Sequence, residues 1–460
     1  MLGVSRSTVT RAYQELVADG LVQAAPSRGT VVAPVEANDA ELPGAAAGSW
    51  LMTLPPVATL GSDAGLLREI VALAGREGMI SFASSAPPED LLPVAELAGI
   101  VRDAFKEQGP KLLSYGPVEG RPELRQVLTN RLQAAGTLSP GDSVIVVSGS
   151  TQGLALAARV LIEPGDEVVV EAPTYIGTIQ TLELSGARLI GVPVDADGIR
   201  TDSLEQVLSR RRIRLIVLQP VFQNPTGASL SRRRSEHVLW LARRHGVPIL
   251  EDDAYSALHY DPHAPGLLKQ LDRHGLVIYL SSFSKTLAPG LRVACMCGPE
   301  PVISRIAMAK QFSDLNTNSV GQTIVSQMIS TGGYDDNLQR LRDAARHRMA
   351  LLLRELDRMS NVLGRDLEPR GGLHVWCRLR VGEAHAAVAM AARSGVAVVA
   401  GTAFYPPASP GPAGRDRIRL SLPVSGEDAI KRGLRRLHEA LKQLPAASEQ
   451  PRSPRTGVVV

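Results

Sequence analysis

Residues 214–255 read RLIVLQPVFQNPTGASLSRRRSEHVLWLARRHGVPILEDDAY, and two short apolar runs in this stretch flank one helical stretch. The apolar runs are residues 214–220 and 247–252, and the helical stretch is residues 231–246. Short apolar runs that alternate with helices indicate a parallel sheet, because two parallel strands must be joined by a crossover connection. Helices then cover both faces of such a sheet. The stretch therefore predicts an α/β protein.

The same alternation extends along most of the chain. Further apolar runs are residues 144–149 (VIVVSG), 167–173 (EVVVEAP) and 276–282 (LVIYLSS), and residues 151–162 have a helical pattern. A long helical stretch at residues 335–359 leads into a second, smaller α/β region. We expect a mostly parallel sheet with helices on both faces and a small C-terminal α/β domain.

Composition excludes several classes of protein. In the 460 residues, 44% are hydrophobic and 21% are charged, so wholesale disorder is excluded and about two to three domains are expected. No apolar run approaches the roughly 18 to 20 residues of a membrane span, and no secretory signal is visible. We expect a soluble, cytoplasmic protein with no membrane partner. The net charge of +4 neither demands nor excludes a nucleic-acid partner.

Metal and disulfide chemistry is not expected. Cys295, Cys297 and Cys377 cannot form a disulfide framework, and no metal-ligand spacing surrounds them or the histidines. Three arginine runs, at residues 210–212, 232–234 and 243–244, sit at helix ends and are interpreted as solvated faces.

The first 33 residues form a separate pattern. Apolar residues recur at helical spacing on one face, at Val9, Ala12, Tyr13, Leu16 and Val17. Two short apolar stretches follow, with the turn Pro26-Ser27-Arg28-Gly29 between them. The pattern predicts a helix, a strand, a turn and a strand. Residues 34–64 are rich in Pro, Ala, Gly, Asp and Ser and are predicted to be a linker.

A lysine stands directly after one predicted strand, in YLSSFSKTLAPGLRVA at residues 279–294. Ser282 lies three residues before Lys285, and Arg292 lies seven residues after it. A lysine flanked by hydroxyls and an arginine can form a Schiff base with an aldehyde while its neighbours bind a phosphate. The alternative is a solvated surface lysine, the commonest environment of that residue.

Other predicted strands also end in polar residues that could bind a ligand. One ends in Asn224-Pro225-Thr226-Gly227, another in Asp252-Asp253-Ala254-Tyr255, and a third feeds residues 148–152 into a helix. Ligands of open α/β sheets bind beyond the carboxyl ends of the strands. A small-residue loop at a helix N-terminus can hold a phosphate, and an aspartate can keep a pyridine nitrogen protonated. Asparagine and tyrosine can hold a phenolic oxygen, and Tyr175 can stack on a ring face.

The motifs N-P-T-G, D-D-A-Y and S-F-S-K-T-L-A-P-G-L-R, in this order, resemble those of fold-type I pyridoxal-phosphate enzymes of the aspartate-aminotransferase superfamily. The resemblance covers roughly residues 80–445. It implies that pyridoxal 5′-phosphate is the cofactor and that Lys285 is the catalytic lysine that carries it. Asp252 would pair with the ring nitrogen. Asp253 is the alternative, but the spacing to Tyr255 favours Asp252.

The resemblance implies further contacts. The ring oxygen would be held by Asn224 and Tyr255, the ring face by Tyr175, and the phosphate by Ser150, Thr151, Ser282 and Arg292.

Two more residues are implied by position. Arg419, in RIRLSL, resembles the arginine that clamps a substrate carboxylate, with a surface arginine on an edge strand as the alternative. Tyr115, in LLSYGPVEG, resembles the tyrosine that reaches the phosphate of the partner subunit, which implies a homodimer with shared sites. At residues 84–86 the chain has Ser-Ser-Ala where the family commonly has a glycine before the proline pair, so substrate preference is left open.

Residues 1–33 resemble the second half of a GntR-type winged helix-turn-helix. The positions that suit DNA contacts are Arg6, Ser7, Thr10 and Arg11 on the recognition helix, with Arg28 at the wing tip. The alternative is an amphipathic helix packed on the main domain. A GntR-like unit joined by a linker to an aminotransferase-like domain is the architecture of MocR-type regulators.

The winged unit of that family begins with one helix and most of a second ahead of the residues equivalent to Leu2-Gly3-Val4. We therefore expect a partial winged unit in this chain. A natural start upstream of Met1 and the loss of part of the unit are both open explanations.

The predicted domains follow from these boundaries. They are a partial winged helix-turn-helix at 1–33, a linker at 34–64, an aminotransferase-like domain at 65–445 and a disordered tail at 446–460. Within the third, the large part is about 105–330 and the small part is about 65–104 and 331–445.

Two functions fit the sequence. The first is a regulator that senses an amine or amino acid through Schiff-base exchange at Lys285 and binds double-stranded DNA through the winged unit. The second is an aminotransferase that moves an amino group from an amino acid to a 2-oxo acid. The N-terminal unit favours the regulator, because a plain transaminase has no use for it.

Overall fold

The computed structural model describes residues 6–18, 22–25, 29–32, 76–262, 266–407, 409, 413–423 and 426–446. The chain divides into two compact units, Met1–Pro56 and Val57–Val460. The predicted linker at 34–64 lies outside the described residues, as does the predicted tail apart from residue 446.

The N-terminal unit has the predicted order of elements. Helix α1 (Arg6–Ala18) is followed by strands β1 (Val22–Ala25) and β2 (Gly29–Val32), which pair antiparallel with Val22 opposite Val32. All five apolar residues of the predicted stripe on α1 are exposed: Val9, Ala12, Tyr13, Leu16 and Val17.

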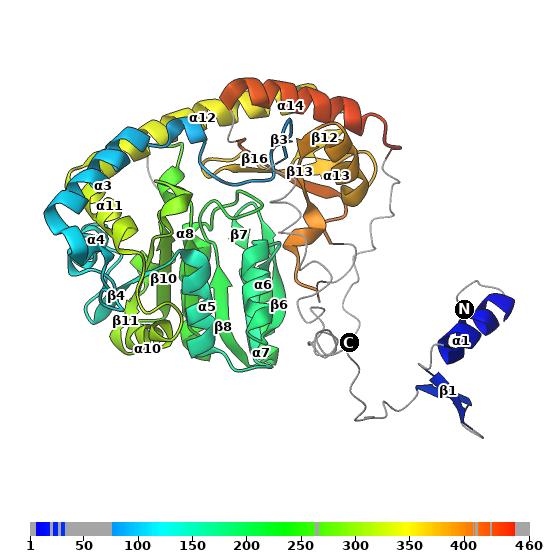
Figure 1. The fold of residues 1–460 in the computed structure, drawn as a ribbon, viewed down its shortest axis with the longest axis horizontal. Coiled ribbons are helices and arrows are strands. Elements are labelled where there is room, and N and C mark those ends of the chain that lie inside the picture. The colour runs from blue at the N-terminus through cyan, green and yellow to red at the C-terminus, as the bar shows by residue number, and fades with distance from the viewer. Residues whose placement is uncertain are drawn as a thin grey trace, which may run out of the picture. The chain divides into compact units, whose positions relative to one another are not determined.

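An eight-stranded sheet forms the centre of the second unit (Figure 1). In spatial order its strands are β4 (Asp142–Val147), β11 (Ala294–Pro299), β10 (Val277–Ser282), β9 (Ile249–Asp253), β8 (Ile213–Leu218), β5 (Glu167–Ala172), β6 (Arg188–Asp195) and β7 (Gly198–Ile199). β11 and β7 run antiparallel to their neighbours, and the pairs from β10 to β6 are parallel. The prediction of a mostly parallel sheet is confirmed.

Helices cover both faces of this sheet, as predicted. One face packs on α5 (Ser150–Leu161), α6 (Ile176–Leu184) and α10 (Glu300–Gln311). The other packs on α7 (Thr201–Arg210), α8 (Arg232–His245) and α9 (Leu268–Leu271), with α4 (Pro122–Ala134) and α11 (Ser319–Ser330) beside β4 and β11. On β5, Val168 and Val170 pack against the helices of one face and Val169 packs against those of the other. Because both faces are buried, the strand is apolar at consecutive positions and does not alternate with polar residues.

A smaller α/β region follows. Its sheet has the order β12 (Leu363–Arg365), β13 (His374–Leu379), β16 (Arg417–Ser421) and β15 (Val399–Ala400). A parallel pair joins β14 (Val396–Ala397) to β3 (Ile80–Ser81), so β3, which precedes the large sheet in the chain, packs in the small region. The helices of the region are α12 (Gly333–Arg358), α13 (Ala384–Arg393) and α14 (Gly426–Leu441).

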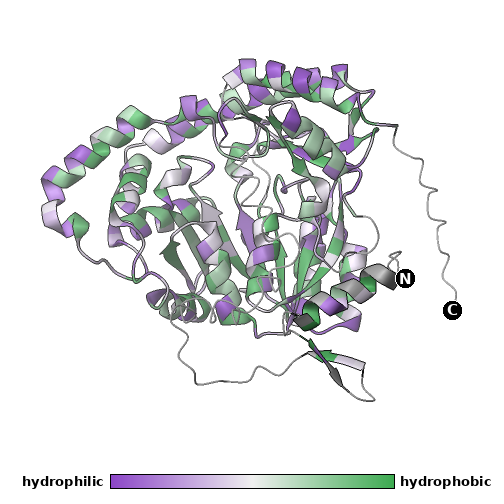
Figure 2. Ribbon diagram, turned by 45° about the vertical axis from the view of Figure 1, so that its right-hand side comes forward, coloured by the Kyte–Doolittle hydropathy of each residue, from purple (hydrophilic) through white to green (hydrophobic). Residues whose placement is uncertain are grey.

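The remaining elements are short or peripheral: η3 (Glu89–Leu91), α3 (Val94–Gln108), η4 (Gly109–Leu113), η5 (Ser256–Leu258), η6 (Pro289–Leu291) and η7 (Gly401–Phe404). Figure 2 shows hydrophobic residues concentrated on the central strands, while the outer helices carry both hydrophobic and hydrophilic residues. No helix in the described part of the chain combines the length and hydrophobicity of a membrane span.

Candidate functional site

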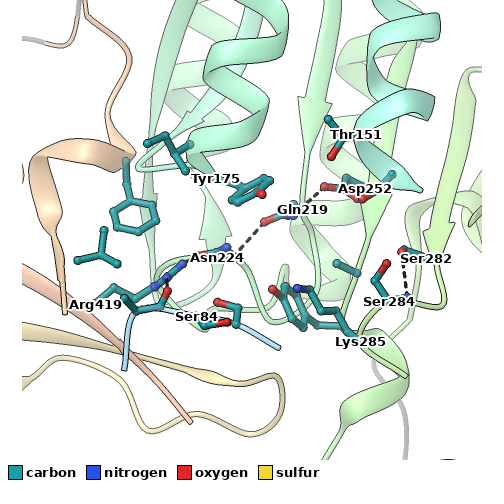
Figure 3. Close-up of a pocket in the computed structure, with 18 of the residues that line it drawn as sticks. Ser84, Thr151, Tyr175, Gln219, Asn224, Asp252, Ser282, Ser284, Lys285 and Arg419 are labelled. Carbon is teal, nitrogen blue, oxygen red and sulfur yellow. Dashed lines mark hydrogen bonds between the residues drawn. The ribbon is translucent and has the colours of Figure 1, made fainter. Parts of the chain in front are cut away.

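A cavity of about 310 Å³ lies at the carboxyl ends of the central strands. Its wall includes all of the predicted cofactor and substrate residues except Tyr115: Ser150, Thr151, Tyr175, Asn224, Asp252, Tyr255, Ser282, Lys285, Arg292 and Arg419. Figure 3 shows that residues from the large sheet and from β16 of the small region point toward one another across it. The site lies where ligands bind in open α/β sheets.

Lys285 lies in the turn after β10 and lines the cavity. Burial lowers the pKa of its amine to about 8, and the nearby positive charges of Arg419 and Arg292 act in the same direction. A larger share of the amine is therefore uncharged near neutral pH than in a solvated lysine. This is the form that can attack an aldehyde.

Asp252, at the end of β9, has two different oxygens. Oδ2 accepts a hydrogen bond of 2.7 Å from Nε2 of Gln219, whereas Oδ1 is buried and has no hydrogen-bond partner among the described residues. Burial raises the pKa of Asp252 to about 6, and the Gln219 hydrogen bond opposes this rise. The carboxyl group is thus mostly ionised at pH 7, and a protonated ring nitrogen would fit the free oxygen.

The neighbouring Asp253 does not line the cavity. Its Oδ2 accepts 2.5 Å hydrogen bonds from the hydroxyls of Tyr279 and Ser256, and its Oδ1 accepts the Ser256 backbone N–H at 2.9 Å. Successive side chains of a strand point to opposite faces, so only one of the two aspartates faces the cavity. That residue is Asp252.

Hydroxyls, a helix N-terminus and a guanidinium meet at one end of the cavity. Ser150 and Thr151 begin α5, and the side chain of Arg292 donates to Oγ of Ser284 and to the carbonyl of Ser148, both at 3.4 Å. Gly149 has a φ of +92°, and a Cβ there would lie 2.3 Å from Nη2 of Arg292. The glycine therefore permits the close approach of the arginine. This cradle of donors and positive charge suits a phosphate.

Two tyrosines and an asparagine lie between the phosphate cradle and the small region. Tyr255 is buried and packs edge-to-face on His374, with the ring centroids 4.8 Å apart. Burial raises the pKa of both Tyr175 and Tyr255 above their ordinary value, so both hydroxyls keep their protons. Oδ1 of Asn224 accepts a 3.1 Å hydrogen bond from Nη1 of Arg419.

Arg419 on β16 is only 5% exposed. Its Nη2 donates to the carbonyl of Ala83, and its guanidinium carbon lies 5.0 Å from the centroid of the Phe404 ring. Burial lowers its pKa to about 10, which leaves it charged at neutral pH. No acidic residue in the described ranges forms an ion pair with it, and its Nε is buried without a partner there. A buried cation of this kind suits a ligand carboxylate.

Some wall residues were missed by sequence reasoning. They include Gln219, Ser284, Phe404 and Val399. Ser84 and Ser85, from the segment that the sequence analysis connected with substrate preference, also line the cavity. Gln219 and Ser284 lie at strand ends that the sequence analysis already identified, so their position after a predicted strand was a usable signal. Phe404 and Val399 carry no such signal, because they reach the cavity only through the folding of the small region.

The remaining predicted residues lie elsewhere. Tyr115 is 85% exposed and does not line the cavity of its own chain. The structure places Arg6, Ser7, Thr10 and Arg11 on α1, and Arg28 lies outside the described residues. Their DNA contacts, like the reach of Tyr115 to a partner subunit, remain predictions.

Comparison with known proteins matches both parts of the chain. Residues 77–437 match the model of the family described as aminotransferase class I and II, and residues 1–32 match that of the gntR family of bacterial regulatory proteins. Several homologues carry the name HTH-type transcriptional regulator, in agreement with the MocR-type resemblance.

Three relatives illustrate the range. The chain is 35% identical to a 2-aminoadipate transaminase of Thermus thermophilus, over 84% of this chain and 95% of the relative. It is 29% identical to the uncharacterized HTH-type transcriptional regulator YdfD of Bacillus subtilis, over 82% of this chain and 77% of that relative. The crystal structure of an α-aminoadipate aminotransferase from Thermus thermophilus, complexed with N-(5′-phosphopyridoxyl)-L-leucine, superposes with a TM-score of 0.78 at 33% identity, covering 86% of this chain and 98% of that one.

These matches imply pyridoxal phosphate as the cofactor. The described residues fit it on three independent features: the buried free oxygen of Asp252, the donor cradle at Gly149 and Arg292, and the lysine of lowered pKa at the strand end.

Proposed function

Since the chain belongs to the aminotransferase class I and II family and has a GntR-type segment at its N-terminus, we propose that it is a pyridoxal-phosphate-binding transcriptional regulator of the MocR type. The observation that carries this proposal is the pairing of the two segments in one chain. Residues 1–32 match a DNA-binding family, and the helix and hairpin of that segment form a unit apart from the aminotransferase-like part. An enzyme that only transfers amino groups needs no such unit.

Within this proposal the cavity is the sensor. The chemistry that pyridoxal phosphate supplies when bound is a reactive aldehyde and an electron-withdrawing ring. Lys285 provides the amine that holds the aldehyde, and Asp252 holds the proton at the ring nitrogen. Ser150, Thr151 and Arg292 bind the phosphate. Arg419 selects amines that also carry a carboxylate, so amino acids are favoured over simple amines.

An amino acid bound in the cavity would add contacts across it. Arg419 belongs to the small region, whereas Lys285 and Asp252 belong to the large sheet. A carboxylate on Arg419 therefore adds a link between the two parts. Such a ligand shifts DNA binding only as far as its affinity differs between the two arrangements of the protein. In the cytoplasmic homodimer that we propose, Tyr115 contacts the phosphate of the partner subunit.

DNA contacts are assigned to the winged unit. Arg6, Ser7, Thr10 and Arg11 would reach the major groove and its phosphates, and Arg28 would contact the backbone from the wing. The test is selection of bound sequences from random duplexes by the full chain loaded with pyridoxal phosphate, with and without a mixture of amino acids. Enrichment of one motif, with an affinity that the amino acids change, supports a regulator. Absence of enrichment under both conditions would overturn it.

A second function has its own observation. Lys285, Asp252 and Arg419 all face one cavity, which is the set that transfer of an amino group requires. In that reaction Nζ of Lys285 takes the proton from Cα of the amino acid while Arg419 holds the carboxylate. The test is a screen of amino acids against 2-oxo acids. Sustained turnover that is lost in Lys285→Ala, together with no DNA binding, would make the protein an aminotransferase.

A further inference from the structure

Gln219 is a buried glutamine whose side chain reaches between two predicted cofactor residues. It follows β8 directly, and its amide lies against Asp252 and Asn224 (Figure 3). Nε2 is 2.7 Å from Oδ2 of Asp252, and Oε1 is 3.2 Å from the backbone nitrogen of Asn224. The side chain therefore bridges the ends of two neighbouring strands.

The chemistry of the partners decides which way the amide faces. The backbone N–H of Asn224 can only donate, so the atom opposite it must be the amide oxygen. The amide nitrogen then faces Asp252, whose oxygen must be the acceptor. Gln219 is also anchored by its own backbone N–H, which donates at 2.9 Å to Oε2 of the buried Glu171. The donor that faces Asp252 thus has a fixed position and a fixed orientation.

This contact leaves one oxygen of Asp252 available. Oδ2 is occupied by Gln219, while Oδ1 is buried and unpartnered among the described residues. A buried carboxylate oxygen without a donor is costly, unless a ligand supplies the missing hydrogen bond. The ring nitrogen of the cofactor is the donor that the proposed function places there.

We propose that Gln219 is a positioning residue that keeps Asp252 ionised and turned so that Oδ1 faces the ring nitrogen of bound pyridoxal phosphate. This inference rests on the proposed cofactor site, and it assigns a role to a residue that neither the motifs nor the family resemblance singled out. Gln219 lines the cavity beside Asp252 and acts through the carboxylate.

The charges around Asp252 predict how the contact responds to pH. The groups that face or influence it are Asp253 on its own strand, Lys285 after β10, Glu171 on β5, and Tyr175 and Tyr255. Burial raises the pKa of Asp252 to about 6, and the Gln219 donor is the strongest opposing influence. Without that donor the pKa rises further, so the carboxyl group becomes neutral at a higher pH and pairs more weakly with a protonated ring.

The experiment measures the affinity of the full chain for pyridoxal phosphate by visible absorbance between pH 5 and pH 9. Gln219→Met keeps the length of the side chain but removes the donor, and Gln219→Asn keeps the amide but shortens its reach. We expect both variants to bind pyridoxal phosphate roughly ten- to a hundredfold more weakly at pH 7. As the pH is lowered, affinity falls when Asp252 becomes protonated. We expect this loss to occur at a higher pH in both variants than in the unmodified chain.

The matched control is Gln223→Met. Gln223 is a second buried glutamine in the same loop, but its amide donates to the carbonyl of Pro173 and to Glu171 and does not contact Asp252. This variant should lose its affinity for pyridoxal phosphate at the same pH as the unmodified chain, even if its free energy of unfolding is lower. If Gln219→Met and the unmodified chain lose their affinity for pyridoxal phosphate at the same pH, the inference is overturned. No binding by the unmodified chain at any pH would instead overturn the proposed cofactor site.

Discussion

Nη1 of Arg419 donates a 3.1 Å hydrogen bond to Oδ1 of Asn224, across 195 positions of sequence. The bond joins β16 of the small region to the loop after β8 of the large sheet. It places the group expected to clamp a carboxylate beside the group expected to hold the ring oxygen of the cofactor. Ligand selection and cofactor binding therefore share one hydrogen-bonded pair.

Arg419→Gln should weaken the binding of amino acids by roughly ten- to a hundredfold, because a charged donor pair to the carboxylate is lost. Binding of the matching amine without a carboxylate should change little. Titration of the visible band of the loaded protein with both ligands measures this. Arg417→Gln is the control, since Arg417 lies on the same strand but pairs with Asp366. Equal losses for both ligands would contradict a carboxylate clamp.

Lys285→Ala and Lys285→Arg should both lose the covalent link to pyridoxal phosphate, since neither side chain can condense with an aldehyde. Arginine keeps the positive charge, so the pair of variants separates charge from covalent bonding. The measurement is borohydride reduction of the loaded protein followed by peptide mass analysis. The unmodified chain should carry the added mass on the peptide that contains Lys285. The same mass on the same peptide of Lys285→Ala would refute the assignment.

Incorporation of pyridoxal phosphate should accelerate as pH rises, reach half of its maximal rate near pH 8 and level off above that pH. Burial lowers the pKa of Lys285 to about 8, and only the uncharged amine attacks the aldehyde. The rate of appearance of the visible band between pH 6 and pH 9.5 measures this. A rate that keeps rising steeply toward pH 10 would indicate a lysine with its ordinary pKa.

Gly149→Ala should lower the affinity for pyridoxal phosphate about tenfold or more. The added Cβ would meet Arg292 at 2.3 Å and push the guanidinium out of the phosphate cradle. Affinity for pyridoxal, which has no phosphate, should be much less affected. Gly165→Ala is the control: Gly165 also has a positive φ, +95°, but nothing lies within 4 Å of its Cβ position. If both variants lose the same affinity, backbone strain and not the arginine is responsible.

Glu171→Gln should flatten the dependence of stability on pH. Burial raises the pKa of Glu171 from 4.5 to about 8. Between these values the folded chain holds a proton that the unfolded chain releases. The contribution of Glu171 to stability is therefore complete below pH 4.5 and is lost as pH rises through 8, by up to about 1.4 kcal/mol per pH unit.

Urea unfolding at pH 5.5 and pH 7.5 measures this slope. The unmodified chain should lose about 1 to 3 kcal/mol more than Glu171→Gln between the two pH values. The exposed Glu163→Gln should keep the slope of the unmodified chain. Identical slopes in all three proteins would show that Glu171 is ionised in the folded state.

Strand-end position accounts for most of what could be predicted. Lys285, Asn224 and Asp252 follow apolar runs, and parallel strands bring their carboxyl ends to one edge of a sheet. Arg419 had a weaker signal, because its strand belongs to the small region, and its position in the cavity depends on how that region packs. Tyr115 illustrates a different limit, since it is 85% exposed in one chain and its predicted contact would need a partner subunit.

The sequence by itself determined the class of fold and the residues that end its strands, because the alternation of apolar runs and helices depends on local periodicity. It also determined the pairing of a DNA-binding type of segment with an aminotransferase-like domain. Only the tertiary structure decided which oxygen of Asp252 is free, that Gln219 holds the other, and that Arg419 meets Asn224. These contacts join segments far apart in the chain, and no local pattern encodes the distance between two side chains that meet only after packing.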